Sequence, residues 1–171
     1  MTEFPTGAQF DAVIAVGSNI GDKAQNIETA TQMVCDAEDV ELVTASQIYK
    51  TPPWGVTDQD WFANACFSVR TSLQPHALLG WCLDVERKMG RERTVKWGPR
   101  VIDLDVLVYR NAVLSDEILT LPHPHITERA FVLVPLIDVA PDLILNGARL
   151  DHWLSLLDQD GIDPLQVPVG A

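Results

Sequence analysis

Two aspartates, Asp103 and Asp105, stand two positions apart in segment 101–109, which otherwise contains only valine, isoleucine, leucine and tyrosine. If this segment is a strand, the alternation of side chains places both carboxylates on one face. Two like charges this close repel each other, and a partly buried carboxylate is costly unless it is paired or bound to metal. Because carboxylates and substrate phosphates commonly hold Mg²⁺ together, the pair predicts a divalent-metal site for polyphosphate chemistry.

A basic segment directly precedes this pair. Six of the twelve lysines and arginines lie between positions 87 and 100: Arg87, Lys88, Arg91, Arg93, Lys96 and Arg100. Guanidinium groups make bidentate contacts to phosphate oxygens, so the segment is consistent with a local anion site. The alternative is a solvated helix end, since cations are favourable near a helix C-terminus. On composition alone both interpretations remain open.

The apolar periodicity predicts the elements that must hold these side chains. Strands are expected at 10–16, 40–50, 61–71 and 102–109, and helices at 23–35, 75–89, 128–139 and 150–157. Two successive strands without an intervening helix give the order β-α-β-β-α-β, which is that of a split, ferredoxin-like sheet with helices packed on it. In the last strand, the apolar face that should hold the aspartates consists of Ile102, Leu104, Val106 and Val108.

The composition limits the class of protein. A chain of 171 residues with 47% hydrophobic and 21% charged residues fits one domain, 1–171, in which 1–9 and 161–171 are expected to be loose ends. The net charge of −12 argues against non-specific nucleic-acid binding. Three cysteines without a Cys-x-x-Cys pair favour reduced thiols. The start has no basic region followed by a long apolar run, so we expect a cytoplasmic protein without membrane contact.

Several motifs now identify a family. Segment 97–109, WGPRVIDLDVLVY, closely resembles the signature of the 6-hydroxymethyl-7,8-dihydropterin pyrophosphokinases of folate biosynthesis. Further segments resemble that family in the same order along positions 10–145: AVGSNIG at 15–21, YKTPPWG at 49–55, Asn64-Ala65, ERKMGRER at 86–93, LPHP at 121–124 and RAFVLVPL at 129–136. Each short match is weak by itself, but six in order around one long motif are specific.

The resemblance implies an α+β fold with a mostly antiparallel, ferredoxin-like sheet and helices on both faces, that is, three layers α/β/α. It also implies an enzyme that transfers the β,γ-diphosphate of ATP to the hydroxymethyl group of the dihydropterin and releases AMP. Two Mg²⁺ ions would assist, and the small molecules ATP and hydroxymethyl-dihydropterin would be the partners. We expect a monomer with this single activity.

The site residues implied by the resemblance fall into four groups. The Mg²⁺ ligands correspond to Asp103 and Asp105, and two mobile catalytic arginines correspond to Arg91 and Arg100. The contacts to nucleotide and triphosphate correspond to Arg93, Lys96, Trp97, His123 and Arg129. The pterin pocket corresponds to Thr51, Pro52, Pro53, Trp54, Phe62, Asn64 and Phe131.

This chain departs from the family pattern at two places. Position 125, where the family often has arginine, is His125, which could change a triphosphate or adenosine contact. The basic loop between Arg91 and Arg100 is also short, so its closing geometry could differ.

Without the resemblance, some residues keep a second interpretation. Phe62 and Phe131 could stack on a flat heterocycle or simply pack in the core. Asn64 could read a heterocycle edge or be a satisfied polar residue near a strand end. His123 could donate to phosphate or stand in a turn. The alternatives for the whole chain are a metal-dependent phosphohydrolase and a non-catalytic nucleotide-binding module.

Overall fold

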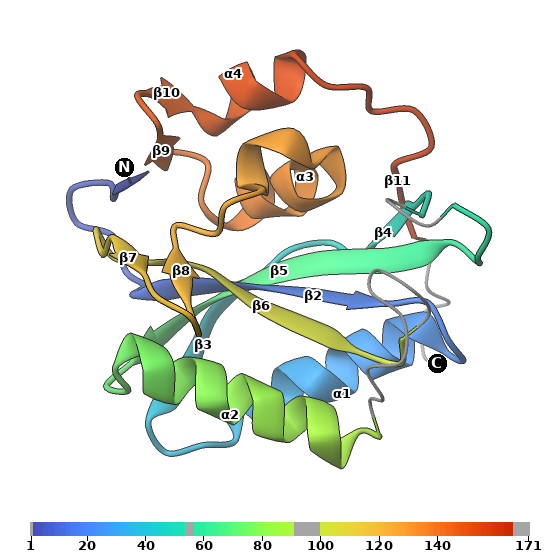
Figure 1. Cartoon of the computed structure of the whole chain (residues 1–171), viewed down its shortest axis with the longest axis horizontal. Coiled ribbons are helices and arrows are strands. Elements are labelled where there is room, and N and C mark those ends of the chain that lie inside the picture. Colours follow the sequence, from blue (N-terminus) through green and yellow to red (C-terminus); the bar gives the residue numbers. More distant parts are fainter. Residues whose placement is uncertain (1, 54–56, 91–99, 166–171) are drawn as a thin grey trace.

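One six-stranded sheet lies between two layers of helices (Figure 1). The computed structural model describes residues 2–53, 57–90 and 100–165. Helices α1 (Lys23–Cys35) and α2 (Pro75–Lys88) cover one face of the sheet, and α3 (Ala130–Val139) covers the other, with α4 (Leu150–Ser155) packed against α3. The arrangement confirms the expected three-layer, ferredoxin-like α+β fold.

Strand β2 (Ala12–Ser18) is central and runs antiparallel to both of its neighbours, β5 (Phe62–Thr71) and β6 (Asp103–Tyr109). The long strand β5 pairs through one half with β3 (Val40–Ala45) and through the other with β4 (Tyr49–Thr51). Strand β6 lies at the end of the sheet's strand order. The remaining elements are β1 (Thr2–Glu3), β7 (Leu114–Ser115), β8 (Thr120–Leu121), β9 (Ile144–Leu145), β10 (Ala148–Arg149), β11 (Asp163–Pro164) and the 3-10 helix Ile126–Glu128.

Helix boundaries follow the local sequence closely. Helix α1 begins as predicted, because the side chain of Asp22 accepts a hydrogen bond from the backbone N–H of Gln25 (3.1 Å) and so caps it. Helix α2 has Pro75 in its first turn, where no backbone donor is needed. Helix α3 continues through Pro135 and begins at Ala130, two residues later than expected.

The predicted single strand at 40–50 is wrong, because residues 46–48, between β3 and β4, belong to no strand. The Ser46 hydroxyl accepts a hydrogen bond from the Cys66 N–H (2.8 Å), while the Ser46 N–H donates to the Cys66 carbonyl (2.8 Å). A register shift between Leu42 and Thr44 adds a bulge. The first strand is also shifted, to 12–18, because Gly17 and Ser18 still pair with β5.

The apolar face predicted for the last strand is correct only in its first part. Ile102, Leu104 and Val106 pack in the core under α1 and α2, but Val108 packs in the core under α3. The register between β2 and β6 shifts in this region, and a bulge of one residue moves all later side chains to the opposite face. The aspartates precede the bulge and therefore keep their predicted face.

Both ends of the described chain are held by strand pairing. Thr2–Glu3 pairs with β9, and Asp163–Pro164 pairs with β4. The expectation of loose ends at 1–9 and 161–171 is therefore wrong for these residues. Within the described ranges no helix is long and apolar enough to cross a membrane.

The three cysteines form no disulfide, as expected for reduced thiols. Cys66 and Cys82 are buried, and burial raises the pKa of both thiols well above its ordinary value. Neutral, buried thiols of this kind act as small apolar side chains.

Candidate active site

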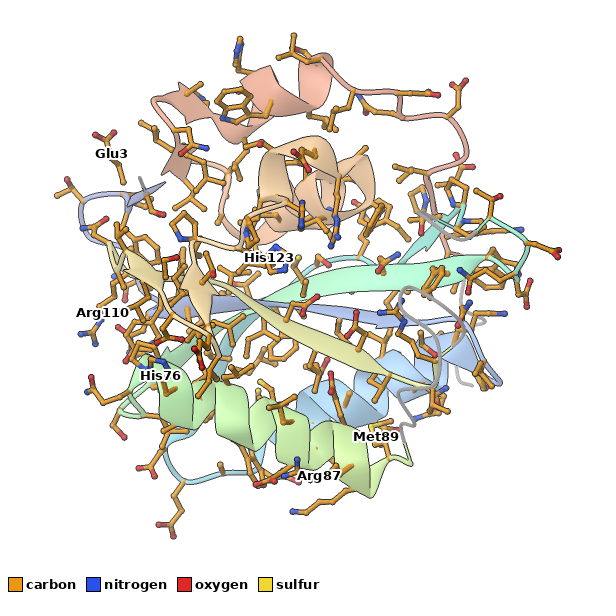
Figure 2. All side chains as sticks on the ribbon, viewed as in Figure 1. Glu3, His76, Arg87, Met89, Arg110 and His123 are labelled. Atoms are coloured by element: carbon orange, nitrogen blue, oxygen red, sulfur yellow. The ribbon has the colours of Figure 1, made fainter. Side chains whose placement is uncertain are left out.

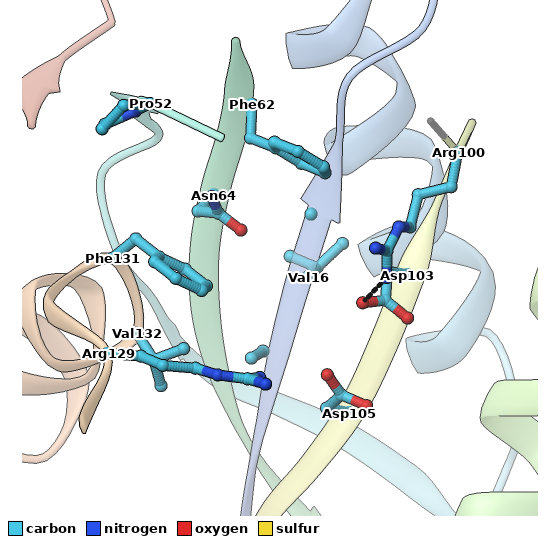
Figure 3. A pocket seen from close by; sticks show the side chains of 12 residues that line it. Val16, Pro52, Phe62, Asn64, Arg100, Asp103, Asp105, Arg129, Phe131 and Val132 are labelled. Atoms are coloured by element: carbon cyan, nitrogen blue, oxygen red, sulfur yellow. Dashed lines mark hydrogen bonds and ion pairs between the residues drawn. The ribbon is translucent and has the colours of Figure 1, made fainter. Parts of the chain in front are cut away.

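A pocket opens on the α3 face of the sheet, above β5, β2 and β6 (Figure 3). Three strands, the segments after β4 and before β6, and the start of α3 supply its lining: Ala15, Val16, Gly17, Pro52, Phe62, Asn64, Arg100, Asp103, Asp105, Arg129, Phe131 and Val132. The pocket gathers eight of the sixteen site residues that were predicted from the sequence: Pro52, Phe62, Asn64, Arg100, Asp103, Asp105, Arg129 and Phe131.

The register of the sheet places the polar groups of the floor. Gly17 of β2 pairs with Asn64 on one side and with Asp103 on the other, so the three residues form one row across the sheet. In the next row, Ala15 is the partner of Asp105. The central strand thus contributes the smallest side chains, which leaves space between the amide on β5 and the carboxylates on β6.

The carboxylate pair faces two arginines. Nη1 of Arg100 lies 2.9 Å from Oδ2 of Asp103, and both side chains are largely buried, with 14% and 24% exposed. The guanidinium of Arg129 extends across the floor toward Asp105 (Figure 3). Burial lowers the pKa of Arg129, while the charges of Asp105 and Asp103 oppose that shift. The pocket therefore combines carboxylates that suit a cation with guanidinium groups that suit phosphate.

A buried glutamate on the opposite side of the sheet steadies the carboxylate strand. Oε2 of Glu86, on α2, accepts a hydrogen bond from the backbone N–H of Leu104 (2.8 Å), and Glu86 is only 2% exposed. Leu104 stands between the two aspartates. Because β6 has a neighbouring strand on one side only along this segment, Glu86 satisfies a donor that would otherwise be orphaned. Sequence reasoning missed this role, although a glutamate on the same stripe as Cys82 and Val85 was a signal.

Asn19 holds the backbone of Arg100. The Asn19 N–H donates to the Arg100 carbonyl (3.1 Å), and the Arg100 N–H donates to Oδ1 of Asn19 (2.8 Å). Nδ2 of the same side chain donates to Oε1 of Gln59 (2.9 Å). The turn after β2 therefore connects Arg100 with the loop before β5. In the sequence, this turn appeared only as part of the motif AVGSNIG at 15–21.

Two phenylalanines border the pocket, and their rings turn toward it (Figure 3). The Arg100 guanidinium carbon lies 5.6 Å from the ring centre of Phe62, and that of Arg129 lies 5.8 Å from the ring centre of Phe131. Both distances are within the range of cation–π attraction. Neither ring is fully buried, and Phe131 also packs against the core on the α3 side of the sheet.

Several other predicted site residues are not part of the pocket lining. Thr51 is buried, and its hydroxyl accepts a hydrogen bond from Nδ2 of Asn64 (2.7 Å). Pro53 is described but is not part of the lining given above. The predictions for five residues fall outside the described part of the chain: Trp54, Arg91, Arg93, Lys96 and Trp97.

His123 lies between α3 and the sheet (Figure 2). Its backbone N–H donates to the Leu107 carbonyl (2.8 Å), and its Nδ1 accepts from the His125 N–H (3.3 Å). Burial first, and then the charges of Arg129 and His125, lower the pKa of His123 to about 4. A neutral ring whose Nδ1 accepts carries its hydrogen on Nε2, so His123 can donate one hydrogen bond. His125 instead faces Glu128, with Nδ1 and Oε2 2.9 Å apart.

The lowered pKa of His123 predicts a pH dependence of stability. The unfolded chain binds a proton near pH 6.5, whereas the folded chain resists it until pH is about 4. The free energy of unfolding should therefore fall as pH drops through this window, with a slope of at most about 1.4 kcal/mol per pH unit from this group. Urea unfolding of His123→Asn between pH 7 and 4.5 should show a shallower fall than the parent. The exposed His152→Asn is the control, and equal slopes in both variants would contradict the prediction.

The pocket combines paired carboxylates, arginines and aromatic rings on a ferredoxin-like sheet. This set of groups suits an enzyme of the class that transfers phosphoryl groups to a flat acceptor. Residues 13–141 match the family model of the 7,8-dihydro-6-hydroxymethylpterin-pyrophosphokinases. A 2-amino-4-hydroxy-6-hydroxymethyldihydropteridine pyrophosphokinase of Methylorubrum extorquens is 49% identical over 155 residues, which are 91% of this chain and 98% of that protein. The Bacillus subtilis protein of the same name is 41% identical, over 88% of this chain and 87% of its own length.

The fold agrees with solved structures. The Plasmodium falciparum HPPK-DHPS crystal structure with pteroate superposes with a TM-score of 0.69 at 14% sequence identity. The match covers 86% of this chain but 42% of that one, so this chain spans less than half the length of that protein. At this identity the likeness concerns the fold alone.

The chain belongs to the 7,8-dihydro-6-hydroxymethylpterin-pyrophosphokinase family. It is an ATP-dependent pyrophosphokinase that transfers a pyrophosphoryl group to hydroxymethyldihydropterin in folate biosynthesis.

Proposed function

We propose that the pocket on the α3 face is the active site, and that it binds the two substrates side by side. The pterin would lie between Phe62 and Phe131, with its edge toward Asn64, and the triphosphate of ATP would lie over Asp103 and Asp105. The observation that carries this proposal is the sheet register, because it sets the amide and a carboxylate on opposite sides of Gly17. That spacing brings the acceptor beside the phosphates.

We also propose that Asp103 and Asp105 hold Mg²⁺, with two ions in the working enzyme. Within the described ranges no group of three or more histidine, cysteine or acidic side chains could enclose a metal. Two carboxylates on one face nevertheless fit Mg²⁺, which usually takes one or two carboxylates, substrate phosphates and water. When bound, the ions would neutralise charge on the phosphate oxygens.

The protein groups would act mainly by positioning, as is usual in phosphoryl transfer. Asn64 and the two rings orient the hydroxymethyl group toward the β-phosphorus. The hydroxymethyl oxygen forms a bond to that phosphorus while the bond from the phosphorus to the α-phosphate oxygen breaks. AMP leaves, and the hydroxyl proton passes to solvent. Arg100 and Arg129 offset the negative charge that is shared among the phosphate oxygens.

The proposed nucleotide contacts extend beyond this pocket. We assign Arg93, Lys96, Trp97, His123 and Arg129 to nucleotide and triphosphate, and Arg91 to catalysis together with Arg100. Thr51, Pro52, Pro53 and Trp54 would border the pterin. The neutral His123 supports this assignment, because its Nε2 hydrogen is available to a phosphate oxygen.

Further proposals concern the whole chain. We propose that residues 1–171 act as one domain, that the protein is a cytoplasmic monomer, and that it binds no nucleic acid. The central six-stranded sheet with helices on both faces supports one domain, and the net charge of −12 argues against nucleic-acid binding.

Product analysis tests the proposed reaction. Incubation with ATP, Mg²⁺ and 6-hydroxymethyl-7,8-dihydropterin should release one AMP per diphosphorylated pterin, as measured by anion-exchange chromatography. Omission of the pterin should reduce nucleotide turnover to background, because water is a poor substitute for a positioned hydroxyl group. Formation of ADP, or pterin-independent hydrolysis at the full rate, would contradict the assignment.

A further inference from the structure

Gly17 lines the floor of the pocket and has no side chain. A Cβ atom built on Gly17 would lie 2.7 Å from Oδ1 of Asn64, which is closer than nonbonded carbon and oxygen atoms approach. The φ angle of Gly17 is outside the left-handed region, so its backbone conformation does not itself require glycine. What requires glycine here is the position of the neighbouring carboxamide.

The carboxamide of Asn64 cannot move aside without losing a partner. Its Nδ2 donates to Oγ1 of Thr51 (2.7 Å), and Thr51 is only 1% exposed. The single hydroxyl hydrogen of Thr51 points to the Phe62 carbonyl, 3.5 Å away, so this hydroxyl must accept from Asn64. The amide nitrogen is thereby turned toward Thr51, and the oxygen faces β2 and the pocket (Figure 3).

We infer that Gly17 is a positioning residue for ligand specificity, which together with Thr51 keeps Asn64 in one orientation with its oxygen presented to the ligand. An amide oxygen only accepts hydrogen bonds. The pocket therefore selects heterocycles that present N–H or NH2 donors on the edge facing Asn64. This inference deepens the proposed function, because it rests on the pterin occupying this pocket.

The next row of the sheet provides an internal comparison. Ala15 stands between Cys66 and Asp105 as Gly17 stands between Asn64 and Asp103, and it carries a Cβ atom. A methyl group is thus accommodated on the same face of β2 one row away. A side chain at position 17 is therefore excluded by the Asn64 amide and not by the sheet itself. A methyl group at this position should displace Asn64 without unfolding the sheet.

The variant Gly17→Ala tests the inference, with Gly80→Ala as the matched control. A Cβ atom at Gly80, in α2, meets nothing within 4 Å. Gly17→Ala should raise the KM for the pterin by about 10-fold to 100-fold, the effect of one lost hydrogen bond to a partly buried group. The KM for ATP should change less than about twofold, and Gly80→Ala should leave both constants unchanged.

Three further measurements separate positioning from a general structural effect. In an Asn64→Ala background, Gly17→Ala should cause no additional rise in the pterin KM, since the clashing group is gone. Thr51→Val keeps the side-chain size but removes the acceptor, and should also raise the pterin KM. Competition with a pterin analogue that carries a carbonyl in place of the 2-amino group should show reduced discrimination in both Gly17→Ala and Thr51→Val.

The outcomes distinguish this inference from the proposed function. If Asn64→Ala itself leaves the pterin KM unchanged, the placement of the pterin fails. If Asn64→Ala raises it but Gly17→Ala does not, only the inference about Gly17 fails. The inference would also be overturned if Gly17→Ala raised the KM for ATP as much as the KM for the pterin. It would be overturned as well if Gly17→Ala still raised the pterin KM in the Asn64→Ala background. If Gly17→Ala does not fold, Thr51→Val decides the question by itself. Unchanged discrimination between the pterin and the carbonyl analogue in Thr51→Val would then overturn the inference.

Discussion

Asp105→Ala should lower kcat by about 1,000-fold or more while leaving a folded protein. Removing one of two carboxylates from a Mg²⁺ site forfeits several kcal/mol of charge stabilisation in the transition state, and each 1.4 kcal/mol is about tenfold in rate. Asp105 lines the pocket and packs in neither apolar core, so its loss leaves the packing of the sheet intact. Steady-state AMP release under saturating substrates measures the effect.

A second measurement, of thermal stability, distinguishes loss of the metal ligand from unfolding of the variant. The parent should bind Mg²⁺ with a non-hydrolysable ATP analogue and gain thermal stability, because a ligand that binds only the native state raises the melting temperature. Asp105→Ala should lose most of the Mg²⁺-dependent part of that gain. Glu117→Ala, an exposed acid in the β7–β8 turn, should keep it. A near-parental rate in Asp105→Ala would show that Asp105 is not a metal ligand.

Arg100→Ala should have effects of opposite sign on two measurements. Turnover should fall by about 100-fold to 1,000-fold, the usual loss when one group that stabilises transition-state charge is removed. Binding of Mg²⁺ in the absence of nucleotide should instead tighten by about 2-fold to 5-fold. Nη1 of Arg100 lies 2.9 Å from Oδ2 of Asp103, and this ion pair should oppose a competing cation by up to about 1 kcal/mol.

Two comparisons sharpen the test of Arg100. Arg100→Lys keeps the charge but not the forked donor geometry, so its kcat should lie between those of the parent and Arg100→Ala. Arg70→Ala removes an exposed arginine whose nearest carboxylate, on Glu41, is 3.9 Å away, and should change neither measurement. Weaker Mg²⁺ binding in Arg100→Ala would mean that the arginine supports the metal site rather than competing with the ion.

The features of the fold that depend on local sequence were predictable. The Asp22 cap, the Pro75 start of α2 and the pairing of the aspartates on one face all follow from rules that act within a few residues. Much of the pocket was predicted as well, but largely through the resemblance to a known family. Phe62 and Phe131, for example, had a core interpretation that periodicity alone could not remove.

The features that escaped prediction depend on contacts between distant segments. The break at Ser46 requires Cys66, twenty positions away, and the change of face at Val108 requires a bulge against β2. Glu86 bonds to a backbone N–H on another element, which no spacing rule encodes. The roles of Gly17 and Asn19 likewise appear only when the strands are in register.

The position of Asn19 has a consequence for how the enzyme responds to its two substrates. One uncharged side chain hydrogen-bonds both to the backbone of Arg100, before β6, and to Gln59, in the loop before β5. A ligand that displaced either segment would act on the other through this side chain. Thermodynamic linkage makes this reciprocal, so any factor by which nucleotide alters pterin affinity is the factor by which pterin alters nucleotide affinity. Asn19 is thus a direct physical connection between the segment of Arg100 and the loop before β5.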